Sequence, residues 1–223
     1  MVALTFDDGP DVTWTPRVLD ALDAAHVTAT FFVVAEQIEA PGGAEVLAET
    51  LRRGHSIQMH CAHHLRHDSL GRQELDADAA EIEAVLAAHG VPEPALWRPP
   101  YGSVNPTHSC RVAAARGRQL VRWTYDSVDY RGLSAAAMLE AARAAPLTDE
   151  SVVLLHDSRR YSSTPRGGAL GTVELIAPLS ERVRASGWEL TALRAPITPA
   201  LAGRDERFLL PCSACAAPPA ETP

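Results

Sequence analysis

The sequence is poor in the features that mark membrane, exported and nucleic-acid-binding proteins. It has no apolar run long enough to span a bilayer, and no charged region followed by a short apolar segment at its start. Acidic residues outnumber basic ones by 28 to 20, so no basic stripe is present that could bind nucleic acid or an anionic membrane. We therefore expect a cytoplasmic protein as the sequence stands, or a secreted or cell-wall protein if the N-terminus is trimmed.

Cysteine and aromatic residues are also scarce. The four cysteines, Cys61, Cys110, Cys212 and Cys215, are too few and too scattered for a disulfide scaffold. The last two form a lone C-x-x-C without a neighbouring histidine, which favours a tail with at most a local disulfide over a metal clip. Aromatic residues make up only 5% of the chain, so the aromatic platforms of an open groove for long polymers are not evident.

Apolar runs and helix-like segments alternate along most of the chain, which is 223 residues long and 46% hydrophobic. Such alternation is typical of parallel strands with helices outside, and about seven apolar runs favour a barrel over an open sheet. The expected strands cover residues 1–6, 28–34, 55–59, 95–98, 119–125, 151–157 and 188–193. The expected helices cover residues 14–27, 44–54, 74–90, 108–117, 134–145 and 172–186. We expect one domain over residues 1–195 and a poorly ordered Pro/Ala-rich tail over residues 196–223.

Charged and imidazole side chains follow the expected strands at the point where each strand ends. The carboxyl ends of parallel strands lie at one edge of the fold, where ligands bind. These residues, from five segments of the chain, are Asp7, Asp8, His60, Arg98, Asp126, Asp129 and His156. We therefore expect them to converge on one rim.

The histidines in "MHCAHHLRH" have a spacing that suits metal binding. His60 and His64 are four residues apart, as are His63 and His67, and this spacing can place two imidazoles on one side of a helical turn. A histidine-rich turn alone is often only a solvated loop. A carboxylate from another segment would complete the three-ligand set of hydrolytic zinc sites.

Five motifs resemble those of the polysaccharide deacetylase family of carbohydrate esterases. They are "TFDDGP", "HCAHH", "RPPYG", "DSVDY" and "LLHD", in this order, and the resemblance runs from about Val2 to Leu193. It implies a distorted (β/α) barrel, a divalent metal held by one aspartate and two histidines, and hydrolysis of N-acetyl groups on amino sugars. Zinc is the expected ion, with cobalt or nickel as alternatives.

The matching positions imply a role for each catalytic residue. The metal ligands would be Asp8, His60 and His64. Asp7 would be the general base, oriented by Arg98, and Asp129 would hold and tune His156, the general acid. Physical chemistry agrees, because adjacent aspartates tolerate each other when one faces a cation and the other an arginine.

Other positions concern the substrate and the departures from the family pattern. The resemblance implies that the backbone N–H of Tyr101 contributes to the oxyanion site and that Leu154 lines the acetyl pocket. Tyr130 replaces a usual Trp on one wall of the groove, and Cys61 replaces a usual Thr or Ser, which affects metal preference. Asp126 either supports the site or has no role. Three further features are expected to lie on the rim: His63, His67 and the loop over residues 158–171, which could narrow the site.

The leading interpretation is a metal-dependent hydrolase that removes N-acetyl groups from a chitin- or peptidoglycan-type oligo- or polysaccharide. Two alternatives stay open: a deacylase of a small N-acylated metabolite, and a non-catalytic, metal-stabilised carbohydrate-binding protein. The presence of base, acid and both of their partners counts against the second alternative. The sequence gives no indication of oligomeric state.

Overall fold

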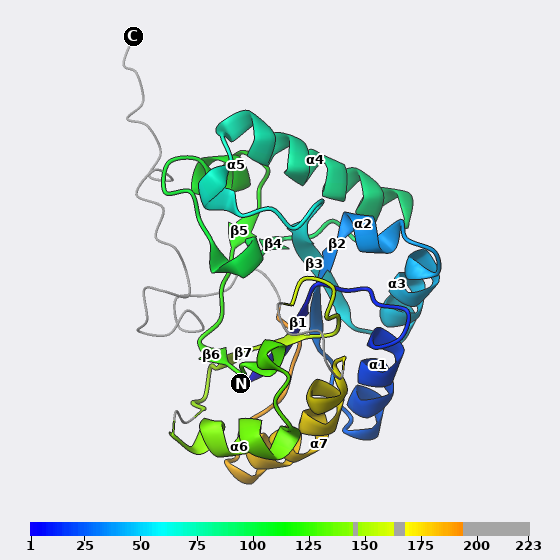
Figure 1. Cartoon of the computed structure of the whole chain (residues 1–223), viewed down its shortest axis with the longest axis vertical. Helices are drawn as coiled ribbons and strands as arrows, with labels where there is room; N and C mark the ends of the chain where they lie inside the picture. The colour runs from blue at the N-terminus through cyan, green and yellow to red at the C-terminus, as the bar shows by residue number, and fades with distance from the viewer. Residues whose placement is uncertain (145–146, 163–167, 194–223) are drawn as a thin grey trace.

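A curled sheet of seven parallel strands forms the centre of the protein, and helices cover its outside (Figure 1). The structure, a computed structural model, describes residues 1–144, 147–162 and 168–193. The strands are β1 Ala3–Asp7, β2 Thr30–Val34, β3 Ser56–Cys61, β4 Leu96–Trp97, β5 Gln119–Leu120, β6 Tyr125–Asp126 and β7 Val152–His156. They are arranged in the order β5-β4-β3-β2-β1-β7-β6. This is the distorted (β/α) barrel that the sequence predicts.

The helices connect successive strands on the outside of the sheet. They are α1 Thr15–Ala24, α2 Ala35–Ile38, α3 Gly43–Arg52, α4 Arg72–Ala88, α5 Ser109–Ala115, α6 Ala135–Ala144 and α7 Leu170–Ala185. Short 3₁₀ turns cover His67–Ser69, Pro100–Gly102 and Asp129–Arg131. Six of these helices were expected from periodicity, whereas α2 is too short to produce a periodic pattern. No helix within the described ranges is long and apolar enough to cross a membrane.

Three neighbouring strands of the sheet, β2, β1 and β7, are buried along almost their whole length. Every residue of β1 and β2 is buried, as is all of β7 except its last residue. Continuous apolar runs such as these suit parallel strands that are covered on both faces. In the core, the rings of Phe6 and Phe31 stack with their centroids 5.0 Å apart. The central strands therefore form a rigid base for the loops at their carboxyl ends.

The expected strand over residues 119–125 is wrong as one element, because it forms two strands at opposite edges of the sheet. β5 pairs with β4, and β6 pairs with β7. The residues between them cross the gap in the barrel, on one side of the molecule in Figure 1. In this crossing segment the carbonyl of Arg122 accepts a hydrogen bond from Arg98 Nη2 at 2.9 Å.

The expected strand over residues 188–193 is also wrong, since only a single parallel bridge joins Leu190 to Val2. Val2 donates to the carbonyl of Glu189 and accepts from the N–H of Thr191. This segment therefore runs parallel to the residues before β1 at a single bridge and forms no further strand of the sheet. The predicted tail over residues 196–223, with Cys212 and Cys215, lies outside the described residues.

Candidate active site

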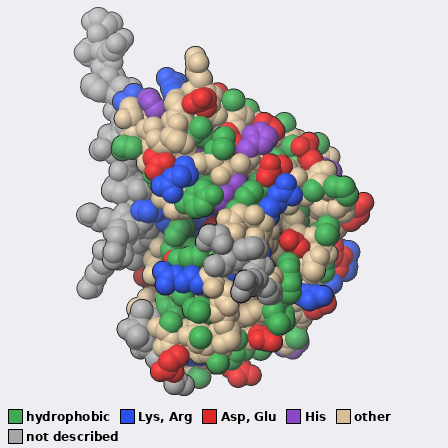
Figure 2. All heavy atoms as spheres, viewed as in Figure 1, with side chains coloured by type: hydrophobic (Ala, Val, Ile, Leu, Met, Phe, Trp, Pro, Cys, Tyr) green, Lys and Arg blue, Asp and Glu red, His purple; other side chains and the backbone are tan. Residues whose placement is uncertain are grey.

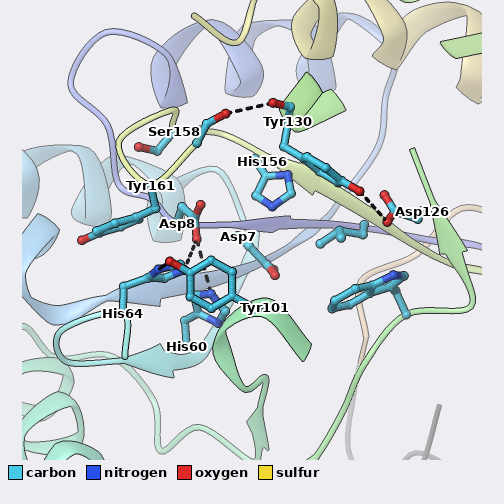
Figure 3. A pocket seen from close by; sticks show the side chains of 13 residues that line it. Asp7, Asp8, His60, His64, Tyr101, Asp126, Tyr130, His156, Ser158 and Tyr161 are labelled. Carbon is cyan, nitrogen blue, oxygen red and sulfur yellow. Dashed lines mark hydrogen bonds and ion pairs between the residues drawn. The ribbon is translucent and has the colours of Figure 1, made fainter. Parts of the chain in front are cut away.

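A pocket of about 370 Å³ opens at the carboxyl ends of the strands (Figure 3). Eight of the ten residues predicted from the motifs line it: Asp7, Asp8, His60, His64, Tyr101, Tyr130, Leu154 and His156. The other two, Arg98 and Asp129, are buried beside it. Asp126 also lines the pocket, and its carboxylate accepts from the N–H of Val128 at 2.8 Å. The tertiary structure thus brings the five motifs together.

Three side chains at the base of the pocket could hold a metal ion. One ligand atom from each of Asp8, His60 and His64 lies within 4.8 Å of the other two. Asp8 Oδ1 lies 3.3 Å from Nε2 of His60 and 3.0 Å from Nε2 of His64. Within the described part of the chain, no well-directed hydrogen bond reaches this buried oxygen. The convergence of three lone-pair donors, one of them otherwise unsatisfied, fits a divalent ion.

The other ring nitrogen of each histidine is occupied. His60 Nδ1 lies 2.6 Å from the carbonyl oxygen of Arg98, and His64 Nδ1 lies 3.2 Å from the hydroxyl of Tyr101. A carbonyl can only accept, so Nδ1 of His60 carries the proton and Nε2 is left free to bind an ion. Burial raises the pKa of Asp8, but the two imidazoles outweigh burial and the net pKa is well below its usual range.

Local contacts hold the two segments that carry these ligands. In the first motif Asp8 has a left-handed backbone, with φ 78°. A side chain at Gly9 would lie 2.3 Å from Asp157 Oδ2, so the motif needs glycine there. In the second motif the backbone N–H groups of Ala62 and His63 donate to the buried carboxylate of Asp78 on α4.

Asp7 is paired with an arginine, as the motifs imply. Arg98 Nη1 donates to Asp7 Oδ1 at 2.7 Å and to the hydroxyl of Thr5 at 2.8 Å. The Arg98 side chain is 0% exposed, and its guanidinium lies over the ring of Phe32. Burial lowers the pKa of Arg98 from its ordinary value. Removing either partner would leave a buried charge unpaired, so the pair fixes the orientation of Asp7.

His156 is held by a second carboxylate. Its Nδ1 lies 2.7 Å from Asp129 Oδ1, and its backbone N–H donates to Asp129 Oδ2 at 2.8 Å. Thr172 on α7 also donates to Asp129. Burial disfavours the imidazolium of His156, but the charge and hydrogen bond of Asp129 outweigh it and raise the pKa to about 10. His156 therefore carries a proton at neutral pH.

Cys61, which departs from the family pattern in the second motif, has contacts that do not favour a role as a metal ligand. Among the described residues, the group that could hold a metal ion consists of Asp8, His60 and His64 and does not include Cys61. Its Sγ accepts the backbone N–H of His64 at 3.1 Å, and burial raises the pKa of its thiol. A neutral, hydrogen-bonded thiol supports the turn in the way a hydroxyl could.

The two extra histidines differ from each other. His63 is 48% exposed, as expected for the rim, and its Nε2 lies 3.1 Å from Glu81. The expectation is wrong for His67, which is buried against Trp97. Burial lowers the pKa of His67 to about 3, so it is a neutral core residue.

Sequence reasoning missed several pocket residues that lie outside the motifs. They are Trp123, Ser158, Tyr161 and Ser162. Trp123 lies on the crossing between β5 and β6, and Tyr161 lies on the loop after β7. The only signal for Tyr161 was the position of its loop at the expected rim. On the face shown in Figure 2, acidic and basic side chains are interspersed, without a large patch of either sign.

The chain belongs to the polysaccharide deacetylase family. The model of that family matches residues 1–121. A peptidoglycan-N-acetylglucosamine deacetylase of Bacillus cereus is 30% identical over 86% of this chain, and one of Listeria monocytogenes is 33% identical over 73%. This chain spans 66% of the length of the first relative and 33% of the second. A family 4 carbohydrate esterase from Streptomyces lividans, solved with acetate, is 27% identical, covering 89% of this chain and 93% of its own, with a TM-score of 0.72.

Proposed function

We propose that the protein is a metal-dependent hydrolase that removes N-acetyl groups from amino-sugar glycans of the chitin or peptidoglycan type. One observation carries the proposal: a group fit to bind a divalent ion lies in the same pocket as a buried Asp7–Arg98 pair and a His156–Asp129 pair. Residues 1–195 would form the catalytic domain, and zinc would be the ion, with cobalt or nickel as substitutes.

The metal ligands would be Asp8, His60 and His64. A divalent ion held there would polarise the amide carbonyl of the substrate and make a bound water more acidic. The family membership and the unsatisfied Asp8 oxygen support this assignment.

The two charge pairs divide the proton transfers between them. Asp7, oriented by Arg98, takes a proton from the attacking water as the C–O bond forms. The resulting oxyanion is stabilised in part by the backbone N–H of Tyr101, a residue whose left-handed backbone (φ 58°) reorients that turn. His156 then donates its proton to the leaving nitrogen as the C–N bond breaks. The products are acetate and a free amine.

The walls of the pocket support an acetylated sugar as substrate. Leu154 and Trp123 offer apolar surface for a methyl group or a sugar ring, while Asp126 and Ser158 offer hydrogen-bond partners for hydroxyl groups. Relatives named as N-acetylglucosamine deacetylases point to the same class of substrate.

The test is acetate release by protein stripped of metal with a chelator and resupplied with zinc, cobalt or nickel. Substrates would be N-acetylglucosamine oligomers of graded length and a small N-acetylated amine. We expect metal-restored release that increases with oligomer length. Release from the small amide alone would instead identify a metabolite deacylase, and stoichiometric metal without any release would identify a binding protein.

A matched pair of histidine variants tests the ligand set. His64→Ala should lose stoichiometric zinc, whereas His63→Ala should retain it, because His63 faces Glu81 outside the pocket. Equal zinc stoichiometry in both variants would remove His64 from the ligand set.

A further inference from the structure

Tyr161 reaches the metal-binding group from a distant part of the chain. It lies on the loop after β7, and its ring stacks on the imidazole of His64, with centroids 4.0 Å apart and planes inclined by 10° (Figure 3). Its packing against a candidate metal ligand distinguishes Tyr161 from Tyr130, which touches His156 across the pocket instead.

The hydroxyl of Tyr161 is held at the far end of the ring. Gln37 Nε2 donates to it at 3.0 Å, and the hydroxyl donates to Glu36 Oε1. Both partners belong to α2, which directly follows β2. The side chain is therefore fixed at its hydroxyl by α2 and packed at its face by His64, so the ring has little freedom to leave the imidazole.

His64 depends on side-chain partners more than His60 does. The ring nitrogen of His60 is held by a backbone carbonyl at 2.6 Å, which is part of the rigid strand end. His64 has a left-handed backbone, with φ 53°, a conformation that is costly for a residue with a side chain. Its ring is held by Tyr101 at one edge and by Tyr161 on one face. Because Tyr101 is largely exposed, Tyr161 is the firmer of these two contacts.

The geometry points to Tyr161 as a positioning residue that orients His64 and thereby sets the affinity of the Asp8, His60 and His64 group for its ion. The inference rests on the proposed function, in which this group binds a divalent metal. Residues that orient a metal ligand typically change metal affinity about tenfold to a hundredfold when they are replaced. Tyr161→Leu, which loses both the stack and the hydroxyl, should weaken zinc binding by about that factor. Tyr161→Phe keeps the ring and should show a smaller loss.

The experiment measures the zinc dissociation constant by competition with a chromogenic chelator. The proteins are the wild type, both Tyr161 variants and Tyr130→Leu, a matched change on the opposite wall. The melting temperature of each metal-free protein is measured in parallel, because a merely structural role would lower it without changing the affinity of folded protein. If Tyr161→Leu fails to fold, Tyr161→Phe decides, since it removes one oxygen only.

Weaker zinc binding by the Tyr161 variants, with Tyr130→Leu like the wild type, supports the inference. The inference alone is overturned if the wild type binds zinc tightly and folded Tyr161→Leu has the same zinc dissociation constant. If Tyr161→Leu does not fold, an unchanged dissociation constant in folded Tyr161→Phe overturns it. An equal loss in Tyr130→Leu also overturns it, because the effect would then belong to the rim in general. A wild type that binds no zinc contradicts the proposed function as well.

Discussion

Replacing Asp129 by asparagine should separate the charge of this residue from its shape. Asp129 is 0% exposed in its side chain, and its carboxylate contacts both the ring and the backbone N–H of His156. The pKa of His156 is raised from 6.5 to about 10, which corresponds to about 5 kcal/mol of differential interaction between its two protonation states. Most of that interaction comes from the negative charge that asparagine lacks.

The sign of the expected change follows from the role of His156 as acid. The rate depends on its protonated form, so activity is lost as pH rises through its pKa. In Asp129→Asn burial would be opposed only by the charges of Asp8 and Asp7, which contribute less than Asp129, and the pKa should fall from about 10 to about 6.5 or lower. At about pH 8 the protonated fraction would drop from near one to about 3%, a loss of at least about thirty-fold in rate.

The assay is the pH profile of kcat for acetate release, measured in zinc-loaded protein. The basic limb of the profile should move down by about 3 units or more in Asp129→Asn. Asp126→Asn is the control, since its carboxylate lines the same pocket but bonds to the Val128 N–H instead of His156. Urea denaturation establishes that each variant is folded. A basic limb that stays in place in folded Asp129→Asn would refute the reasoning.

Two further predictions concern carboxylates of the first and last motifs. Asp7→Asn should lower kcat about a hundredfold to ten-thousandfold while stoichiometric zinc is retained; a near wild-type rate would remove Asp7 as base. Burial raises the pKa of Asp157 to about 7, so its contribution to stability is full below about pH 4 and is lost as pH rises through 7. Asp157→Asn should therefore raise the unfolding free energy of the metal-free protein at about pH 8 by up to about 4 kcal/mol, measured by urea denaturation. If the unfolding free energy of the variant depends on pH in the same way as that of the wild type, this prediction is contradicted.

Much of the fold could be read from local patterns. The buried strands β1, β2 and β7 are continuous apolar runs, and the long helix α4 has the expected period. The errors fall on segments whose pattern is equally apolar but whose partners differ. Residues 119–125 divide between two sheet edges, and residues 188–193 join the sheet through one parallel bridge between Leu190 and Val2. Apolarity predicts burial, but it does not specify which strand provides the hydrogen bonds.

The residues of the candidate site also fall into those that the sequence could predict and those that it could not. Residues that follow an expected strand, such as Asp8 and His156, could be placed on one rim in advance because parallel strands end at a common edge. Their roles, and the choice of His64, Tyr101 and Leu154, came from the resemblance of the motifs to the family.

His67 fits the spacing rule as well as His64 does, yet it is buried beside Trp97. Tyr161 and Trp123 belong to no motif, and they reach the pocket through a loop and a crossing segment.

The sequence by itself determined the alternating architecture and the chemistry of the five motifs, because both depend on residue type and on spacing along the chain. Only the tertiary structure decided that His67 is buried beside Trp97, how β5 and β6 divide, and that Tyr161 packs on His64. These outcomes depend on contacts between residues about 20 to 100 positions apart. Such contacts are selected by packing and hydrogen bonding over the whole domain, which no local pattern encodes.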